Sequence, residues 1–467
     1  MLDDVIDNLK DAIVRTTQEL IRIPSVYEKS TNEKMPFGKN VNSALEYMLD
    51  LGEKLGFRTK NIDGYCGYIE FGEGDELLGI IGHLDVVPEG SDWTYPPFSG
   101  TISEGKIFGR GAIDDKGPVV SSLYAMKAVM DNCKLNKRVR LIIGLNEEND
   151  WECIEHYKEV EESPTVGFSP DADFPCIYAE KSILSCYIKE DYKNTSDKIK
   201  IKEIDCNNNA LNVVPKFCSL VLEINEQELD INNLIKTLKQ FIKENNFEID
   251  IYKLSKTEVK LTSYGVQSHA AHPDLGVNAI SRLLLILSLT FKEFDCNLEL
   301  LDFFNKYINT EYDGTSLGIS CEDESGILTL NVGDFSLEND TLKLGMNLRI
   351  PINTPISDIE KAFQNLCKNY SSLNFETKST EDFLHVPKDD KLVQTLCKVF
   401  NEETNSNSEP IAIGGATYAR AFKNCISFGP NFPGHKDMCH QTDEFVEIDN
   451  LVLACKIYAK AIIELGK

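Results

Sequence analysis

The sequence lacks any apolar run that is long enough to cross a membrane. A transmembrane helix needs about 20 consecutive apolar residues, and no segment of the 467-residue chain approaches that length. The first residues, 1–7, are acidic and contain no apolar stretch, unlike a secretory signal. We therefore expect a cytoplasmic protein with no membrane partner.

Basic residues are scarce relative to acidic ones. The chain has 48 lysines and arginines against 75 aspartates and glutamates, which gives a net charge of −27. A protein that binds nucleic acid needs a basic surface to neutralise phosphates, so this composition argues against that class and against an anionic membrane surface. The 14 cysteines include no CxxC pair, so we predict reduced, mostly buried thiols without zinc-finger spacing.

What the chain does contain is an alternation of amphipathic helices and short apolar strands. The segments with helical periodicity are residues 3–22, 42–55, 118–130, 390–400 and 451–465. The strand-like segments are residues 67–71, 77–81 and 139–145. Gly56 suits a left-handed helix cap, and Asp449 is the expected cap of the last helix. This alternation predicts an α/β domain with a mostly parallel sheet.

The middle of the chain has a different character. Between about residues 184 and 376, strand-like runs such as 217–222 alternate with helices such as 234–244 in segments rich in Lys, Glu and Asn. A chain of 467 residues also exceeds what one hydrophobic core usually supports. We therefore predict an α/β domain made of residues 1–183 and 379–467, interrupted by an inserted α+β domain of residues 184–378.

The chain has only seven histidines, and His83 almost directly follows an apolar strand. Asp85 lies two residues later, so in a strand both side chains would point to the same side. The carboxylate could then bind a metal ion or orient the imidazole ring. Taken alone, such a pair is more often a satisfied surface or core contact.

Two pairs of adjacent carboxylates follow in the sequence. Asp114 and Asp115 lie in a glycine-rich run before a helix, and Glu147 and Glu148 come directly after the strand 139–145. The carboxyl end of a strand is where α/β folds keep their sites. Two neighbouring glutamates could divide the work between metal binding and general base catalysis. Each pair alone is more typical of a solvated acidic turn.

Asp171, Asp173 and His440 complete the set of candidates. The two aspartates follow another short apolar stretch, and His440 lies far along the chain in the run Met438–Glu444. Together the clusters supply two histidines and carboxylates from four separate runs. This mixture suits zinc, cobalt or manganese better than magnesium, which prefers oxygen ligands alone.

Five runs occur in the order GHLDVVPEG, GRGAIDDKGP, NEEND, SPDADFP and MCHQTDE. This order resembles the di-zinc metallopeptidases that include aminoacylases, carnosinases, glutamate carboxypeptidase-like enzymes and desuccinylases, and among them the bacterial dipeptidase V type. The similarity covers nearly the whole chain. It implies a zinc-exopeptidase type of α/β fold (phosphorylase/hydrolase-like) whose insertion is a lid. It also implies two divalent metal ions, zinc first, with manganese or cobalt as alternatives.

The resemblance assigns a role to each matched residue. Asp114 would bridge the two metal ions and form a cis peptide bond with Asp115. Asp85 would orient His83, and Glu147 would be the general base. The implied metal ligands are His83, Asp114, Glu148, Asp171 and His440. The run SPDA favours Asp171 over Asp173 in this set.

The insertion resembles the lid of the same family. The run GVQSHAAHP, followed by GVNA, matches its GxxAHxxxPxxGxNA segment and puts His269 in place of the histidine that polarises the scissile carbonyl. Position 268 is Ser instead of the usual Ala, and His272 is an additional histidine. The substrate-binding residues that the resemblance implies are Asn212, Arg349, Gly414 and Gly415.

The implied reaction is hydrolysis of small, unblocked dipeptides. Arg349 would clamp the substrate carboxylate, because a guanidinium binds carboxylates with two hydrogen bonds. The same metal cage would also suit an N-acyl-amino-acid deacylase, a desuccinylase or an aminotripeptidase. A non-catalytic binding protein would usually have lost a ligand or the base, and every matched position is filled here. The long insertion favours a monomer.

Overall fold

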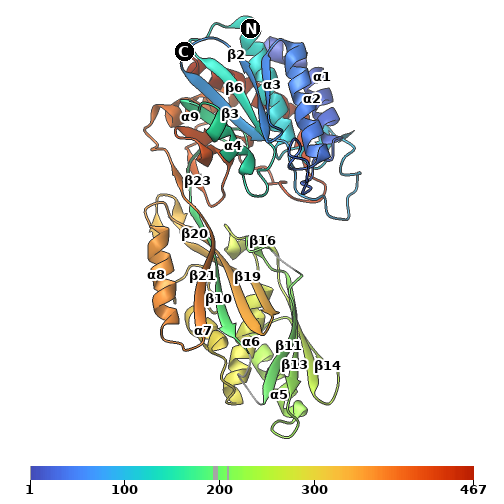
Figure 1. The fold of residues 1–467 in the computed structure, drawn as a ribbon, viewed down its shortest axis with the longest axis vertical. Helices are drawn as coiled ribbons and strands as arrows, with labels where there is room; N and C mark the ends of the chain where they lie inside the picture. Colours follow the sequence, from blue (N-terminus) through green and yellow to red (C-terminus); the bar gives the residue numbers. More distant parts are fainter. Residues whose placement is uncertain (1, 193–197, 208–209) are drawn as a thin grey trace. The chain divides into compact units, whose positions relative to one another are not determined.

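The computed structural model describes residues 2–192, 198–207 and 210–467, which form two compact units (Figure 1). The first unit runs to Ala179 and resumes over Leu384–Ile411 and Ala416–Lys467. The second unit comprises Glu180–Phe383 together with Ala412–Gly415. Ala412–Gly415 thus belong to the second unit, although they lie outside the predicted insertion 184–378.

Parallel strands occupy the centre of the first unit. Among the described residues, nine strands form its main sheet in the order β1-β2-β6-β3-β7-β24-β9-β22, with β23 paired to β9. Strand β3 pairs in parallel with β6 and β7, and β24 pairs in parallel with β7. The antiparallel strands β1 and β2 extend one side of the sheet. The predicted α/β class with a parallel-rich sheet is confirmed.

Each helix and strand predicted for the first unit is present, with bounds that differ by at most four residues, and a further helix and several further strands had no predicted counterpart. The helices are α1 (Leu2–Ile21), α2 (Lys39–Leu55), α3 (Lys116–Asn132), α4 (Glu152–Val160), α9 (Lys391–Thr404) and α10 (Ile448–Leu465). The strands of the main sheet are β1 (Arg58–Ile62), β2 (Cys66–Phe71), β3 (Leu77–His83), β6 (Arg138–Gly144), β7 (Val166–Ser169), β9 (Ile177–Glu180), β22 (Leu384–His385), β23 (Ile411–Ile413) and β24 (Cys425–Ser427). Small sheets are formed by β4 (Thr101–Ser103), β5 (Lys106–Phe108) and β26 (Phe445–Glu447), and by β8 (Ala172–Asp173) and β25 (Pro430–Asn431).

Helix α3 is buried on most of its sides, because it packs against β3 and β6 and is covered by α1 and α10. Gly56 caps α2 in the left-handed conformation, as predicted. The predicted cap of the last helix is wrong. Strand β26 leads directly into α10, so the residue before the helix is Glu447, and Asp449 lies inside the first turn, where it accepts a hydrogen bond from Lys10 at 2.7 Å.

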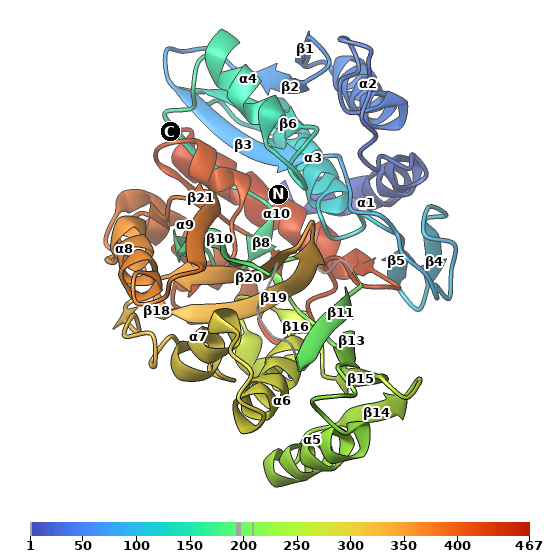
Figure 2. The same ribbon diagram turned by 60° about the horizontal axis from the view of Figure 1, so that its bottom comes forward.

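The second unit has the predicted α+β character. One antiparallel sheet has the order β19-β20-β10-β21 and the other β11-β13-β15-β14. Helix α8 packs against the first sheet, and α5 and α6 pack against the second (Figure 2). The helices are α5 (Ile231–Asn245), α6 (Ala279–Glu293), α7 (Glu299–Tyr307) and α8 (Ile356–Cys367). The strands are β10 (Ser182–Asp191), β11 (Ile199–Asp205), β13 (Phe217–Ile224), β14 (Ile249–Lys253), β15 (Glu258–Tyr264), β19 (Thr329–Glu338), β20 (Thr341–Ile350) and β21 (Leu373–Glu381).

Two expectations from composition can be compared with the structure. No helix in the described part of the chain is long and apolar enough to span a membrane. The cysteines are free thiols, and most of them are buried, as predicted.

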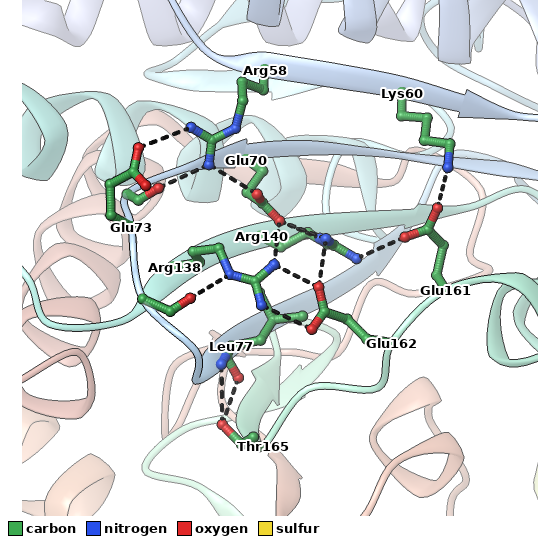
Figure 3. A network of polar contacts seen from close by, with 12 residues as sticks. Arg58, Lys60, Glu70, Glu73, Leu77, Arg138, Arg140, Glu161, Glu162 and Thr165 are labelled. Atoms are coloured by element: carbon green, nitrogen blue, oxygen red, sulfur yellow. Dashed lines mark hydrogen bonds and ion pairs between the residues drawn. The ribbon is translucent and has the colours of Figure 1, made fainter.

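A network of charged side chains joins the amino half of β6 to β2 and to the segment after α4 (Figure 3). The buried Arg140 donates to Glu70 at 2.6 Å and to the hydroxyl of Tyr157 at 2.8 Å. Glu161 and Glu162 each lie 3.3 Å from the same guanidinium. A buried guanidinium with several acceptors is stable only while these partners remain in place.

We predict that Arg140→Met lowers the free energy of unfolding by about 3 kcal/mol. This is the lower part of the range for a broken buried ion pair, because Arg58 and Arg138 still contact Glu70. Arg58→Met is a matched control, since Arg58 pairs with the same carboxylate from a half-exposed position. Its loss should cost at most about 1 kcal/mol. Urea denaturation followed by circular dichroism measures both, and equal losses would contradict the assigned role of Arg140.

Candidate metal centre

His83 lies at the carboxyl end of the central strand β3 and is completely buried. Its Nδ1 donates to the backbone carbonyl of Asp85 at 2.9 Å. This hydrogen bond directs Nε2 toward two carboxylates, at 3.1 Å from Asp114 Oδ1 and 3.6 Å from Asp171 Oδ2. A histidine held in this way presents a defined nitrogen to a metal ion.

A second cluster forms on the other oxygen of Asp114. His440 Nε2 lies 3.1 Å from Asp114 Oδ2 and 3.0 Å from Glu148 Oε1. Asp114 therefore faces His83 with one carboxylate oxygen and His440 with the other. This is the arrangement that a carboxylate needs in order to bridge two metal ions.

The donor atoms of each cluster fit one divalent ion. Within each group the candidate ligand atoms all lie within 4.8 Å of one another. Metal–ligand bonds of about 2.0–2.2 Å in tetrahedral geometry put neighbouring ligand atoms roughly 3.4 Å apart, close to the 3.0–3.6 Å separations measured here. One imidazole with two carboxylates per ion suits zinc, manganese or cobalt.

Asp85 links the first cluster to the glutamate pair. The side chain of Asp85 is fully buried, and its two oxygens accept the backbone N–H groups of Glu147 and Glu148 at 3.1 and 3.0 Å. Its carboxylate is 3.5 Å from Nδ1 of His83, farther than its own carbonyl. Asp85 thus supports His83 mainly through its backbone and the two glutamates through its side chain.

Asp115 packs behind the cluster. The peptide bond between Asp114 and Asp115 is cis, as the family resemblance predicts. Asp115 Oδ2 accepts the backbone N–H of His83 at 3.2 Å. A side chain at position 82 would displace Asp115 or Val119, because a Cβ atom there would lie 2.5 Å from Asp115 Oδ2 and 2.6 Å from Val119.

The clusters stabilise positive charge between their carboxylates. Burial lowers the pKa of His83, but hydrogen bonds to carboxylates, with Asp114 first, outweigh burial and raise that pKa well above its usual value. The side chain of His440 is half exposed; partial desolvation of the ring lowers its pKa, but hydrogen bonds to Asp114 and Glu148 outweigh this effect and raise the pKa. Carboxylates that favour a positive charge at both positions also meet the electrostatic requirement for binding cations.

The environment of Glu147 favours the neutral, protonated form of its carboxyl group. Burial raises the pKa of its carboxyl group well above the usual value, and the nearby charges of Asp171, Glu148 and Asp114 raise it further against the lowering effect of His83. Glu147 belongs to neither group of metal-binding residues. Its position beside both groups, with a proton affinity raised by burial, is suitable for proton transfer.

The structure brings the five predicted metal ligands together in the first unit. Asp173 belongs to neither cluster and lies in the short strand β8, paired with Asn431. Asp171, in contrast, lies in the group formed with His83 and Asp114, so the geometry favours Asp171 as the ligand.

The predicted substrate-binding residues and the predicted catalytic His269 lie in the second unit and form two groups. In one group, strand β12 (Val213–Val214) pairs with β16 (Ser268–His269), and the carbonyl of Asn212 accepts the N–H of Ala270 at 2.9 Å. The side chains of Asn212 and His269 are both exposed.

In the other group, Arg349 donates to the carbonyl of Gly414 at 2.8 Å and to the side chain of Asn347 at 2.9 Å. Gly415 follows Gly414 in the same segment of the second unit. Within the second unit, Asn212 and His269 are thus held together by one set of backbone contacts, and Arg349 and Gly414 by a separate side-chain hydrogen bond.

Three residues near the clusters were not assigned a role from the sequence. Tyr418 is buried with its ring edge-on to His83 at a centroid distance of 6.2 Å, and its hydroxyl contacts Cys153 at 2.7 Å. Arg110 and Glu444 form a buried ion pair of 2.7 Å. Arg110 lies in the run GRGAIDDKGP and Glu444 in the run MCHQTDE, two runs selected from the sequence for Asp114 and His440. Their place in these two runs is the only sequence signal that could have identified them.

The comparisons with known sequences agree with this geometry. The model of peptidase family M20/M25/M40 matches residues 79–464. The protein named "Putative dipeptidase YtjP" of Bacillus subtilis is 40% identical over 465 residues, which cover 98% of each chain. A Staphylococcus aureus protein with the same description is 33% identical over 479 residues, covering 100% of this chain and 99% of the other.

Solved structures show the same fold. Human carnosine dipeptidase 1 superimposes with a TM-score of 0.60 and 15% identity, covering 100% of this chain and 98% of the other. The dipeptidase Dug1p of Saccharomyces cerevisiae gives a TM-score of 0.59 and 14% identity, covering 99% and 98%. From the match of the family model over most of the chain and from these relatives, we conclude that the chain belongs to peptidase family M20/M25/M40 and is a metallopeptidase.

Proposed function

We propose that this metallopeptidase is a dipeptidase that hydrolyses unblocked dipeptides at a centre of two metal ions. The observation that carries the proposal is the position of Asp114, whose two oxygens lie 3.1 Å from His83 and from His440. The 40% identity to a Bacillus subtilis protein described as a dipeptidase supports the substrate class. Zinc is the first choice of metal, with manganese or cobalt as alternatives. A monomeric, cytoplasmic enzyme remains our prediction.

Glu147 is the proposed general base. Bound divalent ions would polarise the substrate carbonyl and lower the pKa of a bound water to ~7. Glu147 accepts the proton of the attacking water and returns it to the leaving amine. The desolvation that raises the pKa of the half-buried Glu147 supports this role, because the carboxyl must keep the proton between the two steps. Asp85 fixes the backbone of Glu147, which supports a constant position of the base.

The second unit supplies the proposed substrate-binding residues. His269 stabilises the negative charge that develops on the carbonyl oxygen, and Asn212 contacts the same oxygen. The direct pairing of their segments, β12 with β16, supports joint action on one group. Arg349 binds the substrate carboxylate, and Gly414 and Gly415 contact the substrate backbone. The hydrogen bond from Arg349 to Gly414 supports the assignment of these residues to one end of the substrate.

Replacement of the general base separates catalysis from metal binding. We expect Glu147→Gln to lower kcat for a dipeptide roughly 10²–10⁴-fold, the usual contribution of a general base. Because Glu147 is not a ligand, the variant should retain the metal content of the wild type, whereas Glu148→Gln should lose metal. Hydrolysis assays with zinc or manganese and elemental analysis measure both effects. Near-full activity of Glu147→Gln would eliminate it as the base.

A pair of matched substrates tests the role of Arg349. Hydrogen bonds to a charged partner contribute about 1.5–3 kcal/mol, so Arg349→Met should raise KM for a dipeptide roughly 10–100-fold. The C-terminal amide of the same dipeptide lacks the carboxylate charge, and its KM should change much less. A similar loss for both substrates would mean that Arg349 supports the fold of the second unit and does not bind the carboxylate.

A further inference from the structure

Two of the segments that carry candidate metal ligands are held by one buried carboxylate. Glu444 is completely buried in the first unit, four residues after His440. Its Oε1 accepts the backbone N–H groups of Ile113 and Asp114 at 3.0 and 3.3 Å. Its Oε2 accepts the N–H of Gly111 at 3.1 Å. A single side chain thus fixes three peptide groups of the glycine-rich segment that carries Asp114.

Arg110 extends this contact to the other segment. Its guanidinium is buried and donates to Glu444 Oε2 at 2.7 Å. The same group lies 3.5 Å from the carbonyl of His440 and 3.3 Å from that of Gln441. His440 itself has a positive φ of 62°, a conformation that non-glycine residues adopt only when their surroundings hold it.

Glu444 binds the backbone of the segment that carries Asp114 as well as its ion-pair partner Arg110. A buried carboxylate is stable only when several donors replace its water shell, and Glu444 has four of them. Three of the four belong to the backbone next to Asp114. Glu444 therefore uses three of its four hydrogen bonds to fix the backbone of the segment whose carboxylate, Asp114, faces both histidines.

We propose that Glu444, together with Arg110, is a positioning residue that holds Asp114 and His440 at the separation required for binding both metal ions. The proposal rests on the two-metal function proposed above. Residues that orient metal ligands from behind typically change metal affinity or activity about 10–100-fold when they are replaced. Neither residue is itself placed to bind a metal ion or substrate.

The variant Glu444→Gln tests the proposal, because the amide has the same size but replaces one of the two accepting oxygens by an NH2 donor. Whichever way the amide is turned, at least one backbone N–H group that the carboxylate now binds loses its acceptor. Mn²⁺ alone, titrated into metal-free full-length protein in a calorimeter, is the probe. We expect the affinity for Mn²⁺ to fall about 10–100-fold. At saturating Mn²⁺, KM for a dipeptide should stay close to that of the wild type.

Glu70→Gln is the matched control. Glu70 is also a buried carboxylate paired with a buried arginine in the first unit, but its network contacts neither of the segments that carry Asp114 and His440 (Figure 3). This variant should lower the melting temperature without changing Mn²⁺ affinity. Should Glu444→Gln fail to fold, Arg110→Lys keeps the charge but removes the guanidinium contact with the carbonyl of His440. Its affinity for Mn²⁺ should fall in the same range.

The outcomes separate this proposal from the function on which it rests. A Mn²⁺ affinity in Glu444→Gln or Arg110→Lys equal to that of the wild type would overturn the positioning role while leaving the metal centre intact. An equal loss of affinity in Glu70→Gln would overturn it as well, because the effect would then be a general loss of stability. Wild-type protein that binds fewer than two Mn²⁺ ions would contradict the two-metal function itself.

Discussion

The structure of the candidate site depends on how several carboxylates can be buried close together around Asp114. Asp114, Asp171 and Glu148 converge with two histidines, and Asp85 and Glu147 lie beside them. Mutual repulsion and loss of water both oppose such a cluster. Backbone N–H groups stabilise the negative charge of Asp85. Burial raises the pKa of Asp114, but hydrogen bonds to His440 and His83 outweigh burial and hold that pKa below its usual value. Two divalent cations would compensate the whole set, so the arrangement of the site follows from the charge that it must hold.

The fold meets this constraint by placing rigid elements behind each ligand. Parallel strands end at the same edge of a sheet, and β3 and β6 pair in register as far as His83 and Gly144. Buried polar contacts then fix the loops that follow these strands. The carboxylate of Asp85, for example, accepts the backbone N–H groups of Glu147 and Glu148. At the amino half of β6, the Arg140 network performs a separate task, because it secures the strand and touches none of the ligands.

Two strand ends could be predicted for a physical reason, because the apolar runs that end just before His83 and just before Glu147 are typical of buried strands. The ligand set came from the resemblance of five ordered runs to the metallopeptidase family, since each acidic pair taken alone is more typical of a solvated turn. The contacts of Glu444 could not be predicted, because a carboxylate that binds distant backbone N–H groups leaves no periodic pattern. The cap at Asp449 was wrong since β26 passes into α10 without a loop. The grouping of Ala412–Gly415 with the second unit likewise depends on tertiary contacts alone.

If the proposed function is correct, Asp114 bridges two metal ions. A crystal structure of the zinc-loaded protein, with anomalous scattering recorded at the zinc absorption edge, tests this directly. We expect two anomalous peaks, each about 2.0–2.2 Å from a different oxygen of Asp114, one next to His83 and the other next to His440. A single peak, or two peaks that share no contact with Asp114, would contradict it.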